Sequence, residues 1–332
     1  MILVTGGTGL IGAHLLFKLV EQGEAVKATY RDKSSIPKVT KVFSYYTDNP
    51  EDYLKKIQWV KADITDLGSL EAHFHDVDYV YHSAALISFD PKDFNSLLKI
   101  NVEGTANVVN LSLKHGIKQL CYVSSIAAIG SGKKGVAINE ETEWNDTYVS
   151  VYGLSKFEAE LEVWRGWKEG LPVVVVNPGI VLGPGFWHSG SGVLFKHVAK
   201  EKKSSFPGGT GFTSVNDVVS AMTYLMKSNI SGERYILVNQ NLSYLDVFEK
   251  IAVAMGVNPP EKKVPMWVLE FLWRMDFLSQ IFTGKRRKLT KNIVKGLYNQ
   301  ENYDNAKSRT IPGFEYESLD DTIAFCSSKF KI

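Results

Sequence analysis

The stretch TGGTGLIG at residues 5–12 constrains the fold more than any other part of the sequence. It follows the apolar run ILV at residues 2–4 and precedes the helical pattern AHLLFKLVEQG. Gly6 permits a sharp turn from strand to helix, Gly9 lets the backbone approach a phosphate, and Gly12 allows close helix packing. Amides at the start of that helix face the anion. The pattern therefore predicts a dinucleotide site. The residues expected to contact the cofactor here are Gly6, Thr8, Gly9, Leu10, Ile11 and Gly12.

Apolar strand-like runs alternate with helical patterns through residues 1–180. The runs are ILVTG, AVKATYR, WVKAD, YVYHSAA, QLCYVSS and VVVVNPG. Such alternation implies right-handed βαβ units and a parallel sheet covered by helices on both faces. The run VVVVN shows no polar alternation, which is typical of a strand buried on both sides. The sequence therefore predicts an α/β fold with a Rossmann-type, doubly wound parallel sheet.

Beyond residue 180 the pattern loosens into glycine-rich stretches, a strand RYILVN and several helices. This composition predicts a smaller C-terminal substrate lobe. We expect an NAD(P)-binding domain at residues 1–180 and a mainly substrate-binding lobe at residues 181–332, with some segments returning to the first domain. The apolar stretch at residues 264–282 is interrupted by charges, so we expect no membrane span.

Composition excludes few functions but narrows the partners. Hydrophobic content of 44% and a net charge of +2 give no reason to expect nucleic acid. Two cysteines, Cys121 and Cys326, make no metal cluster and suit a reducing compartment. The apolar start leaves no room for a signal peptide, so we expect a cytoplasmic protein and leave a homodimer open. The basic run KRRK at residues 285–288 is interpreted as a solvated helix end or loop, with a membrane-surface or anion-binding role as the alternative.

A tyrosine and a lysine stand four positions apart in VYGLSK, at Tyr152 and Lys156. On a helix these positions share one face. An ammonium in a desolvated cleft can lower the pKa of a phenol from its usual value of about 10. Since the pair is common by chance, it needs support from other motifs. The segment QLCYVSSIAAIG supplies it, because it ends a predicted strand with Ser124 and Ser125, of which Ser125 is the better candidate by its distance from Gly130.

These motifs together resemble the short-chain dehydrogenase/reductase superfamily, in its extended branch of the NAD-dependent epimerase/dehydratase type. The resemblance rests on the G-x-x-G-x-x-G spacing, SSIAAIG and YGLSKFEAE, and it covers roughly residues 1–180. The details look most like the dihydroflavonol 4-reductase and hydroxysteroid dehydrogenase group. The resemblance implies an NAD(P)-dependent dehydrogenase or reductase.

The resemblance also implies roles for single residues. Tyr152 would exchange a proton with the substrate oxygen, which Ser125 would hold. Lys156 would lower the pKa of Tyr152 and bind the nicotinamide ribose, while Asn101 would support a proton relay or the helix geometry. No metal is implied. Further cofactor contacts, beside Tyr152 and Lys156, are expected from Asp63, Ile64, Ser83, Ala84, Ala85, Pro178 and Gly179. Asp217 is interpreted as a helix cap.

The choice between NADP and NAD rests on the end of the second predicted strand, AVKATYRDK. Arg31 suits the 2′-phosphate of NADP, whereas Asp32 could serve the free ribose hydroxyl of NAD. We favour NADP, with NAD as the alternative.

For the substrate, the resemblance favours a carbonyl or alcohol on a mainly hydrophobic small molecule. The carbonyl would be reduced by NADPH, or the alcohol oxidised by NADP+. Trp267 and Phe89 are among the aromatic residues that could line an apolar pocket. The alternative for them is lobe core, which is favoured for Trp267 because it belongs to a helical stripe with Phe271 and Phe282. The other pocket candidates are Phe186, Trp187, Phe206 and Phe212.

Two other functions stay open. One is a nucleotide-sugar epimerase or dehydratase, whose diphosphate could be bound by basic residues of the second lobe. The other is a non-enzymatic NADP-binding regulator, against which Tyr152 and Lys156 count. The basic residues in question are Lys196, Lys200, Lys202 and Lys203.

Overall fold

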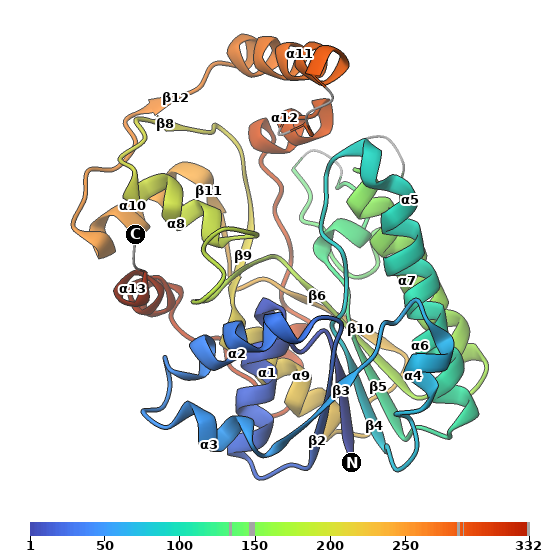
Figure 1. Ribbon diagram of the computed structural model, residues 1–332. Coiled ribbons are helices and arrows are strands. Elements are labelled where there is room, and N and C mark those ends of the chain that lie inside the picture. Colours follow the sequence, from blue (N-terminus) through green and yellow to red (C-terminus); the bar gives the residue numbers. More distant parts are fainter. Residues whose placement is uncertain (133–134, 146–149, 284–285, 288, 331–332) are drawn as a thin grey trace.

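A seven-stranded parallel sheet forms the centre of the computed structural model, which describes residues 1–132, 135–145, 150–283, 286–287 and 289–330 (Figure 1). The strand order is β10-β6-β5-β4-β1-β2-β3, and every neighbouring pair is parallel. This topology confirms the predicted doubly wound sheet. The strands are β1 (Ile2–Thr5), β2 (Val26–Tyr30), β3 (Ile57–Lys61), β4 (Tyr79–His82), β5 (Gln119–Val123), β6 (Val173–Pro178) and β10 (Glu233–Leu237).

Helices cover both faces of the sheet, which is why its central strands are apolar throughout. All residues of β5 and β6 are buried. One face carries α1 (Leu10–Glu21), α2 (Ile36–Phe43), α3 (Pro50–Leu54) and α9 (Val215–Met226). The other carries α4 (Leu67–Glu71), α5 (Phe94–Leu97), α6 (Gly104–Lys114) and α7 (Val151–Lys168).

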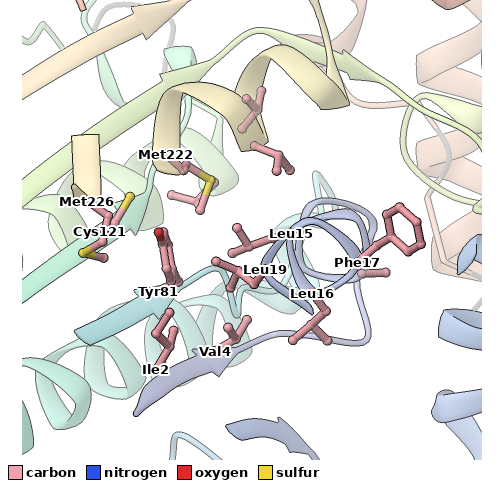
Figure 2. Close-up of a cluster of buried hydrophobic side chains, with 14 of the residues drawn as sticks. Ile2, Val4, Leu15, Leu16, Phe17, Leu19, Tyr81, Cys121, Met222 and Met226 are labelled. Carbon is pink, nitrogen blue, oxygen red and sulfur yellow. The ribbon is translucent and has the colours of Figure 1, made fainter. Parts of the chain in front are cut away.

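Figure 2 shows the core on the α1 face of the sheet. Leu15 and Leu19 of α1 pack there with Val4 of the first strand, and Met222 and Met226 of α9 belong to the same cluster. Helix α9 and strand β10 therefore come from the second half of the chain but belong to the sheet's own layers. The predicted division at residue 180 stays a prediction.

A smaller lobe lies beyond the carboxyl edge of the sheet (Figure 1). Its sheets are β7 (Ile180–Leu182) with β9 (Gly209–Ser214) and β11 (Gln240–Ser243), and β8 (Ser204–Ser205) with β12 (Lys262–Lys263). Its helices are α8 (Gly192–Ala199), α10 (Tyr244–Met255), α11 (Met266–Thr283), α12 (Lys291–Tyr298) and α13 (Leu319–Lys329). Among the described residues, none of the helices is both long and apolar enough to cross a bilayer.

The glycine-rich turn is shaped by close backbone approaches at two of its glycines. Gly6 has a φ of +73°, and a Cβ there would lie 2.5 Å from the backbone nitrogen of Ala84. A Cβ on Gly12 would lie 2.1 Å from the carbonyl oxygen of Gly6. Since both obstacles are backbone atoms, neither can move aside cheaply. The glycines thus hold α1 against the loop that follows β4.

We expect Gly12→Ala to lower the free energy of unfolding by about 1–3 kcal/mol, because the new methyl group overpacks the turn. Urea denaturation measures the change. Gly296→Ala is the matched control, because Gly296 also lies in a helix and a Cβ there meets nothing within 4 Å. Equal unfolding free energies for the two variants would contradict the proposed steric role of Gly12.

Candidate active site

The loops that follow β1 and β4 meet at the carboxyl edge of the sheet, where the strand order reverses direction. The Ser83 hydroxyl donates to the carbonyl oxygen of Thr5 at 2.8 Å, and Ala84 lies directly against Gly6. Gly9 starts α1 with no side chain to cap the first-turn amides, which leaves their N–H groups for an anion. The loop residues from Thr8 to Ile11 are at least partly exposed. This cradle fits a dinucleotide pyrophosphate.

Two other predicted cofactor residues follow β3. The Asp63 carboxylate accepts hydrogen bonds from the Thr65 amide and hydroxyl, both at 2.9 Å. Ile64 is buried, and a Cβ on Gly104 at the start of α6 would lie 2.6 Å from its Cδ1. These contacts hold the segment after β3 near the start of α6. Its contact with the adenine stays a prediction, as do the roles of Ala85, Pro178 and Gly179.

Arg31 and Asp32 differ in how they are engaged at the end of β2. The Asp32 carboxylate accepts the Ser34 amide at 2.9 Å and caps a short helical turn. That hydrogen bond is the main reason that the pKa of Asp32 lies below its usual value. Arg31 is exposed. The Asp32 carboxylate is therefore already engaged by its own loop, whereas the Arg31 guanidinium is exposed at the surface.

Helix α7 brings Tyr152 and Lys156 to one face, as the sequence predicts. The helix starts after Ser150, whose hydroxyl accepts the Gly153 amide at 2.9 Å. The Lys156 ammonium is buried and donates to the Tyr122 hydroxyl at 2.6 Å and to the Val123 carbonyl at 2.8 Å. Lys156 thus fastens α7 to strand β5.

The direction of the pKa shift at Tyr152 differs from the prediction. Burial raises the pKa of Tyr152 to about 12, and an interaction with the Ser125 hydroxyl opposes the rise. Burial lowers the pKa of Lys156 to about 7, and the nearby Glu160 carboxylate opposes that change. The predicted lowering of the Tyr152 pKa by Lys156 is wrong for this arrangement, because the ammonium is directed at Tyr122 and not at Tyr152.

The two serines at the end of β5 have different partners. The Ser124 hydroxyl is buried and donates to the Glu160 carboxylate at 2.6 Å. Ser125 is partly exposed, and its hydroxyl accepts the Ala127 amide at 3.1 Å while also lying beside the Tyr152 phenol. The structure thus brings Ser125 and Tyr152 together and turns Ser124 away.

Glu160 is a residue of this region that the sequence reasoning missed. Besides Ser124, its buried carboxylate accepts from Asn177 at 2.9 Å and Trp164 at 3.2 Å, and forms an ion pair with Arg234 at 3.2 Å. The signal was present in YGLSKFEAE, because Tyr152, Lys156 and Glu160 follow each other at four-residue spacing.

Asn101 lies in a π-helical turn over Leu98–Glu103, a feature that is frequent at functional sites. Its side-chain amide accepts the Leu86 amide at 2.7 Å and donates to the Leu86 carbonyl at 3.0 Å. It also donates to the Ser155 hydroxyl at 2.9 Å. Asn101 therefore joins the segment after β4 to helix α7. These contacts agree with the predicted support of the helix geometry, and the predicted proton relay stays a prediction.

The predicted pocket aromatics separate into different environments. Phe89 packs edge-on against Tyr152, with ring centroids 5.4 Å apart, and is 43% exposed. Trp267 is 73% exposed on α11, so its predicted packing in the lobe core is wrong. The face of α11 that contacts the protein carries Leu269, Asp276 and Gln280 and not its aromatic stripe. The remaining four aromatics pack in or against hydrophobic cores, and these are Phe186, Trp187, Phe206 and Phe212.

Asp217 caps helix α9, as predicted. Ser214 and Asp217 form a reciprocal capping box, and the Asp217 carboxylate also accepts from Asn239 at 3.0 Å and from the Glu317 amide at 2.9 Å.

Comparison with known proteins identifies the family. The model of the NAD dependent epimerase/dehydratase family matches residues 2–239. The chain belongs to this family. The predicted family, and with it the prediction of a nicotinamide-dependent enzyme, is confirmed.

The chain is similar in sequence to a protein named as a reductase and to one named for sterol demethylation, and similar in fold to an epimerase. A Synechocystis protein named "Putative dihydroflavonol 4-reductase" is 29% identical, over 97% of this chain and 92% of its own length. Sterol demethylase protein B of Methylococcus capsulatus is 25% identical, over 92% of this chain and 91% of its own length. The structure of UDP-glucuronic acid 4-epimerase from Bacillus cereus in complex with NAD shares the fold, with a TM-score of 0.72 at 20% identity, over 99% of this chain and 97% of that one.

The lowered pKa of Lys156 makes stability depend on pH. Because the folded-state pKa of about 7 lies below the unfolded value of 10.5, the unfolded chain binds more protons between these pH values. The free energy of unfolding of the unsubstituted protein, relative to Lys156→Met, should therefore rise with pH from about 7 toward 10, by at most about 1.4 kcal/mol per pH unit.

Urea denaturation at several pH values measures this difference. Lys55→Met is the control, since Lys55 lies in an exposed ion pair and its difference from the unsubstituted protein should stay flat. A flat difference for Lys156→Met as well would show that the ammonium is not desolvated.

Proposed function

We propose that this protein is an oxidoreductase that transfers a hydride between NADPH and a carbonyl or alcohol on a mainly hydrophobic small molecule. One observation carries the proposal. The Tyr152 phenol and the Ser125 hydroxyl lie together at the carboxyl edge of the sheet, the edge that also carries the glycine-rich cradle. A proton donor and a hydrogen-bond donor thus stand at the edge where a dinucleotide would be held.

The chain's own residues supply proton transfer and positioning. Tyr152 is protonated at neutral pH, since burial raises its pKa to about 12, and it would donate its proton to the oxygen of a carbonyl substrate. Ser125 would donate a hydrogen bond to the same oxygen and hold it. Lys156 would turn from Tyr122 toward the ribose and the phenol. The nicotinamide supplies or accepts the hydride when it is bound.

The surroundings of Arg31 support NADP over NAD. Asp32 already accepts the Ser34 amide, whereas Arg31 is exposed at the end of β2. A guanidinium there would bind the 2′-phosphate of NADP bidentately.

A hydrophobic substrate is supported by the apolar residues beside Tyr152. Phe89 contacts the Tyr152 ring and is 43% exposed, and Ile87, two positions before it, is 61% exposed. Relatives named for dihydroflavonol and sterol chemistry agree with this class of substrate.

Tyr152→Phe should lower kcat for ketone reduction by about 100-fold or more while leaving NADPH binding nearly unchanged, because only the proton donor is lost. The rate is followed by absorbance of the reduced nicotinamide with a panel of apolar ketones and alcohols. Tyr298→Phe is the control, because Tyr298 is 42% exposed on α12. Full activity of Tyr152→Phe would refute the assigned role, and turnover of UDP-sugars without any ketone reduction would favour an epimerase.

Arg31→Ala should weaken NADPH binding by about tenfold or more and change NADH binding much less, because only NADPH carries the 2′-phosphate. Fluorescence titration of the two cofactors measures both affinities. Asp32→Ala is the matched variant at the neighbouring position and should not reproduce this selectivity. Equal losses for both cofactors in Arg31→Ala would remove the assignment of NADP.

A further inference from the structure

Helix α11 exposes its apolar side chains and turns polar ones inward. We call the exposed apolar residues of its outward face the α11 stripe, which leaves out Leu272 and Phe277, exposed at 47% and 38% on its flanks. The stripe residues recur at spacings of three and four, so they lie on one face of the helix. Trp267 is 73% exposed and Phe282 is 82% exposed, so most of the surface of these two large apolar side chains meets solvent. The α11 stripe consists of Trp267, Phe271, Met275, Leu278, Ile281 and Phe282.

Hydrogen bonds on the opposite face fix the orientation of the helix. The Asp276 carboxylate accepts the Leu289 amide at 2.8 Å, and the Gln280 side chain accepts from Arg287 Nε at 2.8 Å. Leu269 on this face is 2% exposed. Rolling the stripe inward would break these bonds, so the apolar face points outward as part of the fold. Monomeric proteins rarely expose a continuous apolar strip of this kind without an interaction to cover it.

Basic residues stand at both ends of the α11 stripe. Lys262 and Lys263 are exposed on β12, directly before the helix, and β12 pairs with β8, which follows the exposed Lys202 and Lys203. Arg286, three positions after the last residue of the helix, has 79% of its side chain exposed. Of the basic run predicted at 285–288, residues 285 and 288 lie outside the described residues.

Arg274 is the basic residue nearest the middle of the α11 stripe. It pairs with Glu270 and packs over the Trp273 ring at 4.7 Å, with 56% of its side chain exposed. An arginine at such a place can lie along an apolar surface and keep its charge among polar headgroups.

We propose that helix α11 lies in the interface of an anionic lipid bilayer, with the α11 stripe inserted at the level of the acyl chains. An amphipathic helix with aromatic residues on one face and basic residues around it binds such surfaces through apolar burial and charge together. Lys262, Lys263 and Arg286 would then meet lipid phosphates. At about 1.5 Å per residue, the 18 residues of α11 lie flat over about 27 Å.

A second copy of the chain is a poorer occupant of the same face. Two α11 helices paired in parallel would set Lys262 and Lys263 beside their own copies. An antiparallel pair would set them beside Arg286 of the partner helix. Both arrangements bring like charges together, whereas anionic headgroups neutralise them.

The same segment touches the loop next to the candidate active site. Arg286 forms an ion pair with Asp93 at 3.4 Å, and the Arg287 amide donates to Asp90 at 3.2 Å. Asp90 follows Phe89, whose ring packs against Tyr152. A bilayer that holds α11 would therefore lie close to the loop that borders the site, at the end of the molecule remote from the amino terminus (Figure 1).

The test is flotation of the whole protein with vesicles of phosphatidylcholine alone and of phosphatidylcholine with about one third phosphatidylglycerol. We expect binding to the anionic vesicles, weakened by added salt. Trp267→Ser combined with Phe271→Ser should weaken that binding by about tenfold or more. Lys262→Glu combined with Lys263→Glu should reduce the preference for anionic vesicles. All four side chains are exposed, so these variants should fold normally.

Matched controls separate the stripe from general surface effects. Leu161→Ser removes an exposed apolar side chain, 50% exposed on α7. Lys55→Glu reverses an exposed charge directly after α3, a helix at the opposite end of the molecule from α11 (Figure 1). Both should float as the unsubstituted protein does. The proposal is overturned if the unsubstituted protein stays with neither vesicle, or if the stripe variants bind undiminished. It is equally overturned if the stripe variants only convert a dimer into a monomer.

Discussion

The buried ammonium of Lys156 is the constraint on which the candidate site depends. Removing a charge from water costs several kcal/mol unless partners replace the water. Here the Tyr122 hydroxyl and the Val123 carbonyl accept its hydrogen bonds, and the carboxylate of Glu160 lies nearby. These partners belong to β5 and α7, so satisfying the charge docks the helix on the strand. Tyr152, one turn earlier, is thereby placed at the sheet's carboxyl edge.

The two sides of the site are held by different physical means. On the cofactor side, backbone contacts at Gly6 and Gly12 leave no space for a side chain, so the shape of the turn is steric. On the other side, Asn101 exchanges hydrogen bonds with the Leu86 backbone and donates one to Ser155, which joins a loop to α7. The cradle is therefore fixed by backbone contacts, whereas the link between that loop and α7 depends on the hydrogen bonds of a single buried side chain.

The difference between local steric contacts and hydrogen bonds across the chain explains which features the sequence could predict. The parallel sheet and the glycine cradle follow from local patterns, because apolar runs and glycine spacing act within a few residues. The spacing of Tyr152 and Lys156 likewise predicted a shared face. The target of the ammonium could not be predicted, because Tyr122 lies 34 residues away in the sequence. Periodicity also located the stripe containing Trp267 but not its exposure, since the buried face is fixed by hydrogen bonds that Asp276 and Gln280 accept from residues beyond the helix.

The pKa shifts at the site bear on how the proposed proton transfer would start. Burial raises the pKa of Tyr152 to about 12, so the phenol is protonated at neutral pH, and it lowers the pKa of Lys156 to about 7. A neutral phenol is a proton donor, which suits the reduction of a carbonyl. In the proposed reaction, Lys156 would turn away from Tyr122 toward the ribose and the phenol. That turn gives up two buried hydrogen bonds of the ammonium before new ones form. The proposed reaction needs that turn in either direction, so the cost of breaking these two hydrogen bonds would fall on reduction and oxidation alike.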